Sequence, residues 1–397
     1  MRKNWRISIL VVAALTVLAT PVLVGATQST VGASKSQRTI RIGVLESETG
    51  TSASACLNEI PAIKLAIARF KGAASFKLIV QDDQSTPADG ALGYRTLIGE
   101  NVDAVIGPCF SVVGLAVYPL IDPAKTPTVF TTDGGDAQLV APTYAFGSAV
   151  PSGYYTYKAL QVLHSKGLNN VYMIDEPSVP TLVSIQDSFQ SAIAEYHMNL
   201  VGTYAAGATD TTFTTEVEKI AQLNPGVVIA DVRASQLGTF ITELRSDGLT
   251  TQVVGTNDDY ITSVLTLGGV IDQLLLPTNF ATVFTYPSSK AFTKAYALKY
   301  NTEPTVNSAT GYDAMLRVLT AINTEGAAKV AESSTAKARG LIEKGLLAQK
   351  GTQLAGAQGP LRFEGPHGDA RTVSPGGVIE ITNAAGFQRL LKPPTSG

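Results

Sequence analysis

The stretch AVIGPCFSVVG, residues 104–114, has the pattern of a buried strand that ends just before a helix. Its first three residues are apolar, and the Gly107-Pro108 pair that follows is typical of a strand end. A cysteine and a serine then precede a run with helical composition. In open parallel sheets, ligands bind beyond the carboxyl ends of strands, where the next helix begins. Ser111 is therefore a candidate ligand contact.

Similar short runs rich in Val and Ile recur along the chain, with amphipathic segments such as EIPAIKLAIARF (59–70) between them. Their near-continuous hydrophobicity indicates strands buried on both faces, as in parallel sheets. The alternation with helices predicts an α/β fold of doubly wound parallel sheets. A chain of 397 residues with this many units is expected to form two domains. The runs are TIRIGVL (39–45), FKLIVQDD (76–83), DAVIGP (103–108), TPTVFTTD (126–133), NNVYMID (169–175), PGVVIAD (225–231) and TQVVGTND (251–258).

Composition and motifs argue against several function classes. The net charge is -2, and no basic block follows the first six residues, so we expect no nucleic-acid partner. The G-x-S-x-G, P-loop and G-x-G-x-x-G patterns are missing from the sequence. His164, His197 and His367 fall away from the predicted strand ends, and no cluster has metal-ligand spacing. We therefore expect a protein that is not an enzyme and needs no metal or cofactor.

The first residues, MRKNWR, are basic, and an apolar run with small residues at its end follows them. This order is typical of a secretory signal, here residues 1–26 with cleavage near Ala26. An uncleaved membrane anchor is the alternative, because the apolar run approaches spanning length. No cysteine lies near this position, so a lipoprotein with an N-terminal Cys is not expected. The sequence predicts an exported protein, either periplasmic or at the cell surface.

The chain contains two cysteines, Cys56 and Cys109. An even pair in an exported protein is a candidate disulfide, and both fall at neighbouring strand-to-helix turns of the predicted sheet. Two buried free thiols are the alternative.

Small polar and charged residues also follow the predicted strands of the second half. DVRAS (231–235) offers Asp231 and Arg233, and TNDDY (256–260) offers Asn257 and Asp258. Helix caps and turns account for many acidic residues at such positions. Several acids against one base nevertheless favour a ligand with an amine or many hydroxyls.

Six segments together resemble the type I periplasmic solute-binding proteins of the leucine/isoleucine/valine-binding family. They occur in the family's order and extend the resemblance from about Thr39 to Leu391. The segments are IRIGVLESETG (40–50), VQDDQSTPADGA (80–91), VDAVIGPCFSVVG (102–114), TPTVFTTDGG (126–135), ATGYDAMLRVLTAI (309–322) and GAQGPLRFEGPHGD (356–369).

The resemblance implies two Rossmann-like lobes with parallel sheets, joined by a three-stranded hinge. Lobe I would comprise 39–149 and 279–360, and lobe II 150–278 and 361–397. It also implies an exported, monomeric receptor that closes on a small solute and passes it to an ABC permease in the membrane. The alternative is a ligand sensor that reports to a membrane signalling partner.

The resemblance also points to individual residues. Ser111 matches the family's serine after the third strand, which holds a ligand carboxylate, and Thr132, Asp133 and Gly134 fall at the group after the fourth strand. Where the family has an aromatic residue in lobe II, this chain has Val179. The solute is therefore expected to be an amino acid, an amide or a polyol-like compound.

Overall fold

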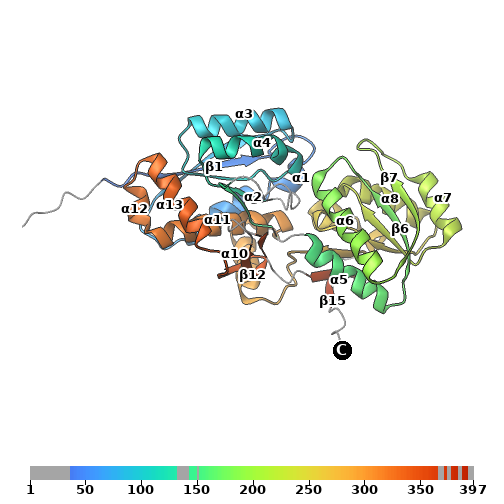
Figure 1. The fold of residues 1–397 in the computed structure, drawn as a ribbon. Helices are drawn as coiled ribbons and strands as arrows, with labels where there is room; N and C mark the ends of the chain where they lie inside the picture. Colours follow the sequence, from blue (N-terminus) through green and yellow to red (C-terminus); the bar gives the residue numbers. More distant parts are fainter. Residues whose placement is uncertain are drawn as a thin grey trace, which may run out of the picture. The chain divides into compact units, whose positions relative to one another are not determined.

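The computed structural model describes residues 36–131, 143–149, 152–364, 371–372, 377–382 and 387–391 (Figure 1). The predicted signal segment 1–26 and the site residues Thr132, Asp133 and Gly134 lie outside this part of the chain. Within the described ranges, no helix combines the length and hydrophobicity needed to cross a membrane.

The first part of the chain forms a five-stranded parallel sheet in the order β2-β1-β3-β4-β5. Alternate side chains of β1 enter two different cores: Ile42 and Val44 pack with α2, and Leu45 packs with α3 and α4. Figure 1 shows these helices on opposite sides of β1. The elements are β1 (Ile40–Glu46), α1 (Ala53–Cys56), α2 (Glu59–Arg69), β2 (Phe76–Asp82), α3 (Pro87–Gly99), β3 (Ala104–Ile106), α4 (Ser111–Ala124), β4 (Thr128–Phe130) and β5 (Ala145–Gly147).

A second sheet has seven strands in the order β15-β14-β10-β9-β8-β6-β7. The strands from β10 to β7 run parallel, whereas β14 pairs antiparallel with both β10 and β15. Its elements are α5 (Ser152–Ser165), β6 (Asn170–Asp175), α6 (Pro180–Glu195), β7 (Asn199–Ala205), α7 (Thr214–Leu223), β8 (Val227–Asp231), α8 (Ala234–Ser246), β9 (Gln252–Val254), the 3₁₀-helix η2 (Asn257–Asp259), α9 (Thr262–Leu265), the 3₁₀-helix η3 (Gly268–Ile271), β10 (Leu275–Thr278), β14 (Gly377–Thr382) and β15 (Phe387–Leu391).

Four helices and a small antiparallel sheet, β11-β12-β13, lie in sequence between β10 and β14. Helix α11 packs on α2, which attaches this segment to the five-stranded sheet. The elements are α10 (Pro287–Tyr300), α11 (Val306–Glu325), α12 (Ala327–Ala331), α13 (Thr335–Leu347), β11 (Gln353–Gly356), β12 (Gly359–Glu364) and β13 (Arg371–Thr372).

The predicted α/β fold with two parallel sheets is confirmed, and each of the seven predicted runs contains a strand. Strand β7 was missed because it lies at the edge of its sheet and is partly exposed, so it lacks a continuous apolar run. Strands β1–β5 fall within the first predicted segment of lobe I, and β14 and β15 fall within the second segment of lobe II. The exact lobe boundaries stay predictions.

A buried polar network joins the segments after β5 and β10 to the turn between β11 and β12. The side-chain amide of Gln358 donates to the Ser148 carbonyl at 2.8 Å, and the Asn279 amide donates to Gln358 Oε1 at 2.8 Å. Asp313 on α11 accepts from the backbone N–H groups of Ala357 and Gln358 at 2.6 and 3.0 Å. Segments after β5, after β10 and before β12 are therefore held together by hydrogen bonds between buried groups.

Candidate functional site

A cavity of about 1290 Å³ opens where strands of both sheets end. Its lining includes the first residues of α4, α8 and α11, together with side chains near the starts of α2 and α6. Parallel strands bring their carboxyl ends, and hence the following helix N-termini, to one edge of each sheet. The two sheets thus build the cavity from the same kind of element.

Ser111 is the first residue of α4 and lines the cavity, as predicted from the Gly-Pro strand end. Its side chain is only 2% exposed, and its hydroxyl oxygen has no hydrogen-bond partner among the described residues. A buried hydroxyl without a partner is costly. At a helix N-terminus, where backbone N–H groups and the helix dipole favour negative charge, this hydroxyl suits a ligand anion.

Thr131, which directly follows β4, lines the cavity and stands one residue before the predicted Thr132. Its hydroxyl donates a 3.4 Å hydrogen bond to the carbonyl of Pro108. Thr131 was missed because the resemblance placed the contact after the strand, at Thr132, Asp133 and Gly134. Those three residues lie outside the described part, so their role stays a prediction.

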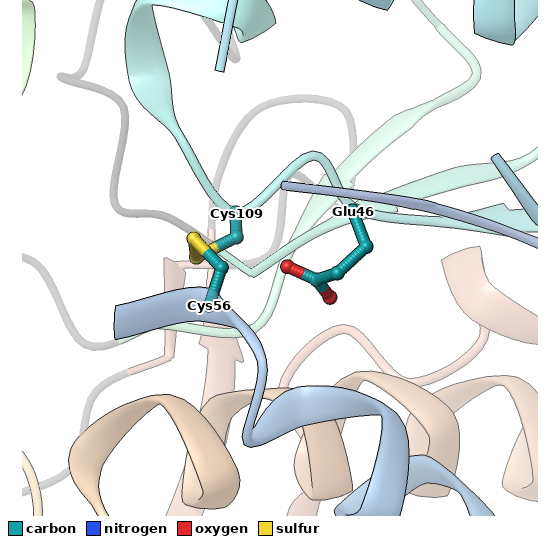
Figure 2. Close-up of side chains that lie close together, drawn as sticks. All are labelled: Glu46, Cys56 and Cys109. Carbon is teal, nitrogen blue, oxygen red and sulfur yellow. A yellow bond between two sulfur atoms is a disulfide. The ribbon is translucent and has the colours of Figure 1, made fainter. Parts of the chain in front are cut away.

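Cys56, at the end of α1, forms a disulfide with Cys109, in the turn that leads to Ser111. Both cysteines line the cavity. The side-chain amide of Asn307 donates to Cys109 Sγ at 3.6 Å. Figure 2 shows the Glu46 carboxylate beside the disulfide. A carboxylate oxygen of Glu46 lies within 4.8 Å of both sulfur atoms. Because both sulfurs are bonded to each other, this cluster offers no thiolate to a metal ion.

Three buried acids lie next to this turn, and sequence reasoning missed all of them as site residues. They are Glu46 at the end of β1, Glu59 at the start of α2, and Asp83 just after β2. Glu59 is 1% exposed and lines the cavity. Burial raises the pKa of Glu59 to about 8. Burial, together with Glu59 and Asp83, raises the pKa of Glu46 well above its ordinary value.

Asp83 is held by two hydrogen-bond donors. Its carboxylate accepts from the Ser47 hydroxyl at 2.6 Å and from the Ser85 backbone N–H at 2.8 Å. Burial nevertheless raises its pKa. The run VQDD marks Asp83 as polar at a strand end, which was the available sequence signal.

On the side of the seven-stranded sheet, Arg233 lines the cavity in an ion pair with the buried Glu176. Their Nε and Oε2 atoms are 2.9 Å apart, and Arg233 also donates to the Ser178 hydroxyl at 3.3 Å. The Ser178 hydroxyl and backbone N–H both donate to Glu176. These three residues form a closed network at the strand ends. The ion-pair partner Glu176 was not predicted.

Asp231 is fully buried at the end of β8 and is not part of the cavity lining. Its neighbours Val232 and Arg233 do line the cavity. Val179, which stands where the family has an aromatic residue, lines it as well.

Asn257 and Asp258, which were predicted as ligand contacts at this strand end, line the cavity from η2, and their contact with a ligand stays a prediction. The Asn257 carbonyl oxygen Oδ1 is buried without a partner among the described residues. Burial raises the pKa of Asp258 to about 6. The adjacent Asp259 points elsewhere: its carboxylate accepts from Thr256 N–H at 2.7 Å and so caps the turn.

Comparisons with known proteins agree on the family. The sequence profile of a family described as "Periplasmic binding protein" matches residues 39–377. No curated protein sequence matches the chain.

Several solved structures share the fold. The leucine-binding protein LivK from Thermotoga maritima is 19% identical, with a TM-score of 0.75 over 89% of this chain and 98% of that one. A solute-binding protein from R. palustris in complex with benzoate is 18% identical, with a TM-score of 0.77 over 89% and 95%. LivJ from Streptococcus pneumoniae in complex with isoleucine is 20% identical, with a TM-score of 0.75 over 90% and 100%.

The family and these neighbours are solute-binding proteins and not enzymes, and the family is extracytoplasmic. The likeness at 18–20% identity establishes the fold, whereas the family assignment comes from the profile that covers most of the chain. The chain belongs to the periplasmic binding protein family.

Proposed function

We propose that this protein binds a small polar solute, an amino acid or a related compound, in the cavity and delivers it to an ABC permease. The observation that carries the proposal is the buried, unpartnered hydroxyl of Ser111 at the start of α4, facing a cavity lined from both sheets. Isoleucine and benzoate, bound by two of the similar structures, both carry a carboxylate. We infer that Ser111 and the α4 N-terminus bind this group.

The test begins with a thermal-shift screen of amino acids, amides, polyols and aromatic acids. A true ligand raises the melting temperature by mass action, because it binds the folded state alone. We expect carboxylates to be enriched among the hits. A screen whose hits all lack a carboxylate would contradict the assignment of Ser111.

Ser111→Ala tests the contact itself, with calorimetry on a hit from the screen. We expect binding to weaken by about 1 to 2 kcal/mol, because one hydrogen bond to a charged group is lost. Ser289→Ala is the matched control, since Ser289 is also buried with an unpartnered hydroxyl but lies on α10 outside the lining. An unchanged affinity of Ser111→Ala would remove Ser111 from the site.

Delivery and export need separate measurements. We expect the loaded monomeric protein to stimulate ATP hydrolysis by a reconstituted permease, whereas stimulation of a membrane kinase instead would support a sensor.

For export, we propose that residues 1–26 are removed, and we expect N-terminal sequencing of the secreted protein to begin near Thr27.

A further inference from the structure

The cavity presents more hydrogen-bond acceptors than donors. Five lining side chains have a buried atom without a hydrogen-bond partner among the described residues, and three of these atoms are carbonyl or carboxylate oxygens. The atoms are Glu59 Oε2, Ser111 Oγ, Asn257 Oδ1, Asn279 Oδ1 and Arg233 Nε, the last of which lies 2.9 Å from Glu176 Oε2 in an ion pair. Buried acceptors of this kind are normally satisfied, so a bound solute is expected to bring donors.

Positive charge in the lining is already neutralised. Among the described lining residues, Arg233 is the cation, and it is paired with Glu176 at 2.9 Å. The acidic side chains of the lining include Glu59 and Asp258. The other ionisable side chains of the described lining are therefore acids, which are either negatively charged or protonated.

Glu59 lies among other acids and neutral groups. Glu46 reaches it from β1, Asp83 from the end of β2, and Thr131, from the end of β4, forms a hydrogen bond with it. The backbone of α11 packs closely against Glu59, because a Cβ added at Gly311 would lie 2.9 Å from Glu59 Cβ. The disulfide beside Glu46 carries no charge.

Asp313, the carboxyl of α11 nearest in sequence to Gly311, accepts hydrogen bonds instead from the backbone N–H groups of Ala357 and Gln358. In the described part, the charged groups that act on Glu46 and Glu59 are therefore acids alone. Without a cation nearby, both carboxyls of this buried pair stay protonated at neutral pH, and one donates a hydrogen bond to the other.

We propose that Glu59 determines the specificity of the cavity by binding a protonated amine of the solute, while Glu46 keeps its own proton and donates a hydrogen bond to Glu59. This inference rests on the proposed solute-binding function and names the class of solute. Binding converts the Glu59 carboxylic acid to a carboxylate, which pairs with the R–NH₃⁺ group, and releases one proton to the solvent. Glu46 acts as a positioning residue.

The direction in which the affinity for an amine changes with pH follows from the proton that Glu59 releases on binding. Glu59, with a pKa of about 8, is mostly protonated at neutral pH in the empty protein. An alkyl amine stays charged well above this pH, since its ordinary pKa is about 10. Below pH 8, binding must therefore expel a proton. The affinity for an amine is expected to rise with pH, by up to about tenfold per unit, and to level off above pH 8.

The test uses two matched pairs of probes: leucine with 4-methylpentanoate, and 4-(aminomethyl)benzoate with benzoate. Calorimetry at pH 6, 7 and 8, in two buffers of different ionisation enthalpy, measures affinity and proton release together. We expect at least one amine to bind more tightly than its matching acid, with proton release and an affinity that increases with pH. If neither amine binds, or if neither binds more tightly than its acid, the inference is overturned.

Three variants locate the amine. Glu59→Gln is expected to weaken binding of the amine by roughly 10- to 100-fold, to remove its pH dependence and to leave the acid's affinity unchanged. Glu46→Gln replaces the protonated Glu46 carboxyl with an amide donor, so the pH dependence should move to lower pH. If Asp258→Asn removes the amine preference and Glu59→Gln does not, the amine binds at η2 and the inference is wrong.

These experiments distinguish failure of the inference about Glu59 from failure of the proposed solute-binding function. If both members of a pair bind equally and Ser111→Ala weakens both, the protein still binds solutes but Glu59 has no role in selecting amines. If Ser111→Ala changes nothing, the proposed anion contact fails whatever the result for Glu59.

Discussion

Glu59, at the start of α2, and Glu176, just after β6, are both buried carboxyls beside the cavity, but their surroundings differ. Glu176 accepts from the Ser178 hydroxyl and backbone N–H, and it pairs with Arg233. Glu59 faces Glu46 and Asp83, and the charged groups that act on it in the described part are acids. Burial raises the pKa of Glu59 to about 8, whereas Glu176 has its counter-ion within the protein.

The difference shows which of the two carboxyls a solute can pair with. A buried charge is tolerated when it is paired and hydrogen-bonded, and an unpaired one takes up a proton instead. Glu176 is paired with Arg233 without a ligand. Glu59, by contrast, has an oxygen without a hydrogen-bond partner among the described residues, as do Ser111 and Asn257, and a solute can satisfy these atoms.

The largest expected effect comes from removing the disulfide, which ties α1 to the turn before Ser111. The double variant Cys56→Ala/Cys109→Ala opens a loop of 53 residues and should lower the free energy of unfolding by about 4 kcal/mol. Denaturant unfolding measures this loss, and wild-type protein with reductant is the control. A loss below about 1 kcal/mol would mean that packing alone holds the turn.

A smaller effect concerns the pH dependence of stability in the empty protein. Burial raises the pKa of Glu59 to about 8 and that of Asp313 to about 7. Both exceed their unfolded values near 4, so the folded state binds more protons between these limits. Stability is then greatest below pH 4 as far as these groups are concerned, and it falls as pH rises through 7 and 8.

Each group contributes at most about 1.4 kcal/mol per pH unit to this fall. Melting temperatures from pH 5 to 9 measure it, and Glu59→Gln should flatten the curve between pH 7 and 8. A wild-type curve that rises over this range would show that Glu59 is ionised in the empty protein. The comparison of the two carboxyls would then lose its basis.

The sequence predicted most of the fold because buried parallel strands have continuous apolar runs. The position of Ser111 at the start of a helix was also predictable, since a Gly-Pro strand end followed by a helix places the next hydroxyl at the edge of the sheet. Edge strand β7 lacks such a run and was missed.

The acids show why the rest of the site was not predictable. Glu59 has the sequence pattern of an ordinary acidic residue in the first turn of a helix, and its pairing with Glu46, 13 positions earlier, depends on packing. Asp231 and Arg233 are two residues apart, but β8 ends between them and only Arg233 lines the cavity. Residue type and spacing do not determine which side chain turns inward at a strand end.

The smallest expected effect tests the other half of the comparison, the Glu176–Arg233 pair. Arg233 is 27% exposed, so solvent screens the pair, and we expect a coupling energy of about 1 kcal/mol. A double-mutant cycle of Glu176→Gln and Arg233→Gln, measured by denaturant unfolding, gives this value. Because the network is complete without a solute, Arg233→Gln should also weaken binding of a carboxylate less than Ser111→Ala does. If Arg233→Gln weakens it more, the solute anion binds on the side of the seven-stranded sheet, and the unpartnered hydroxyl of Ser111 is not its anchor.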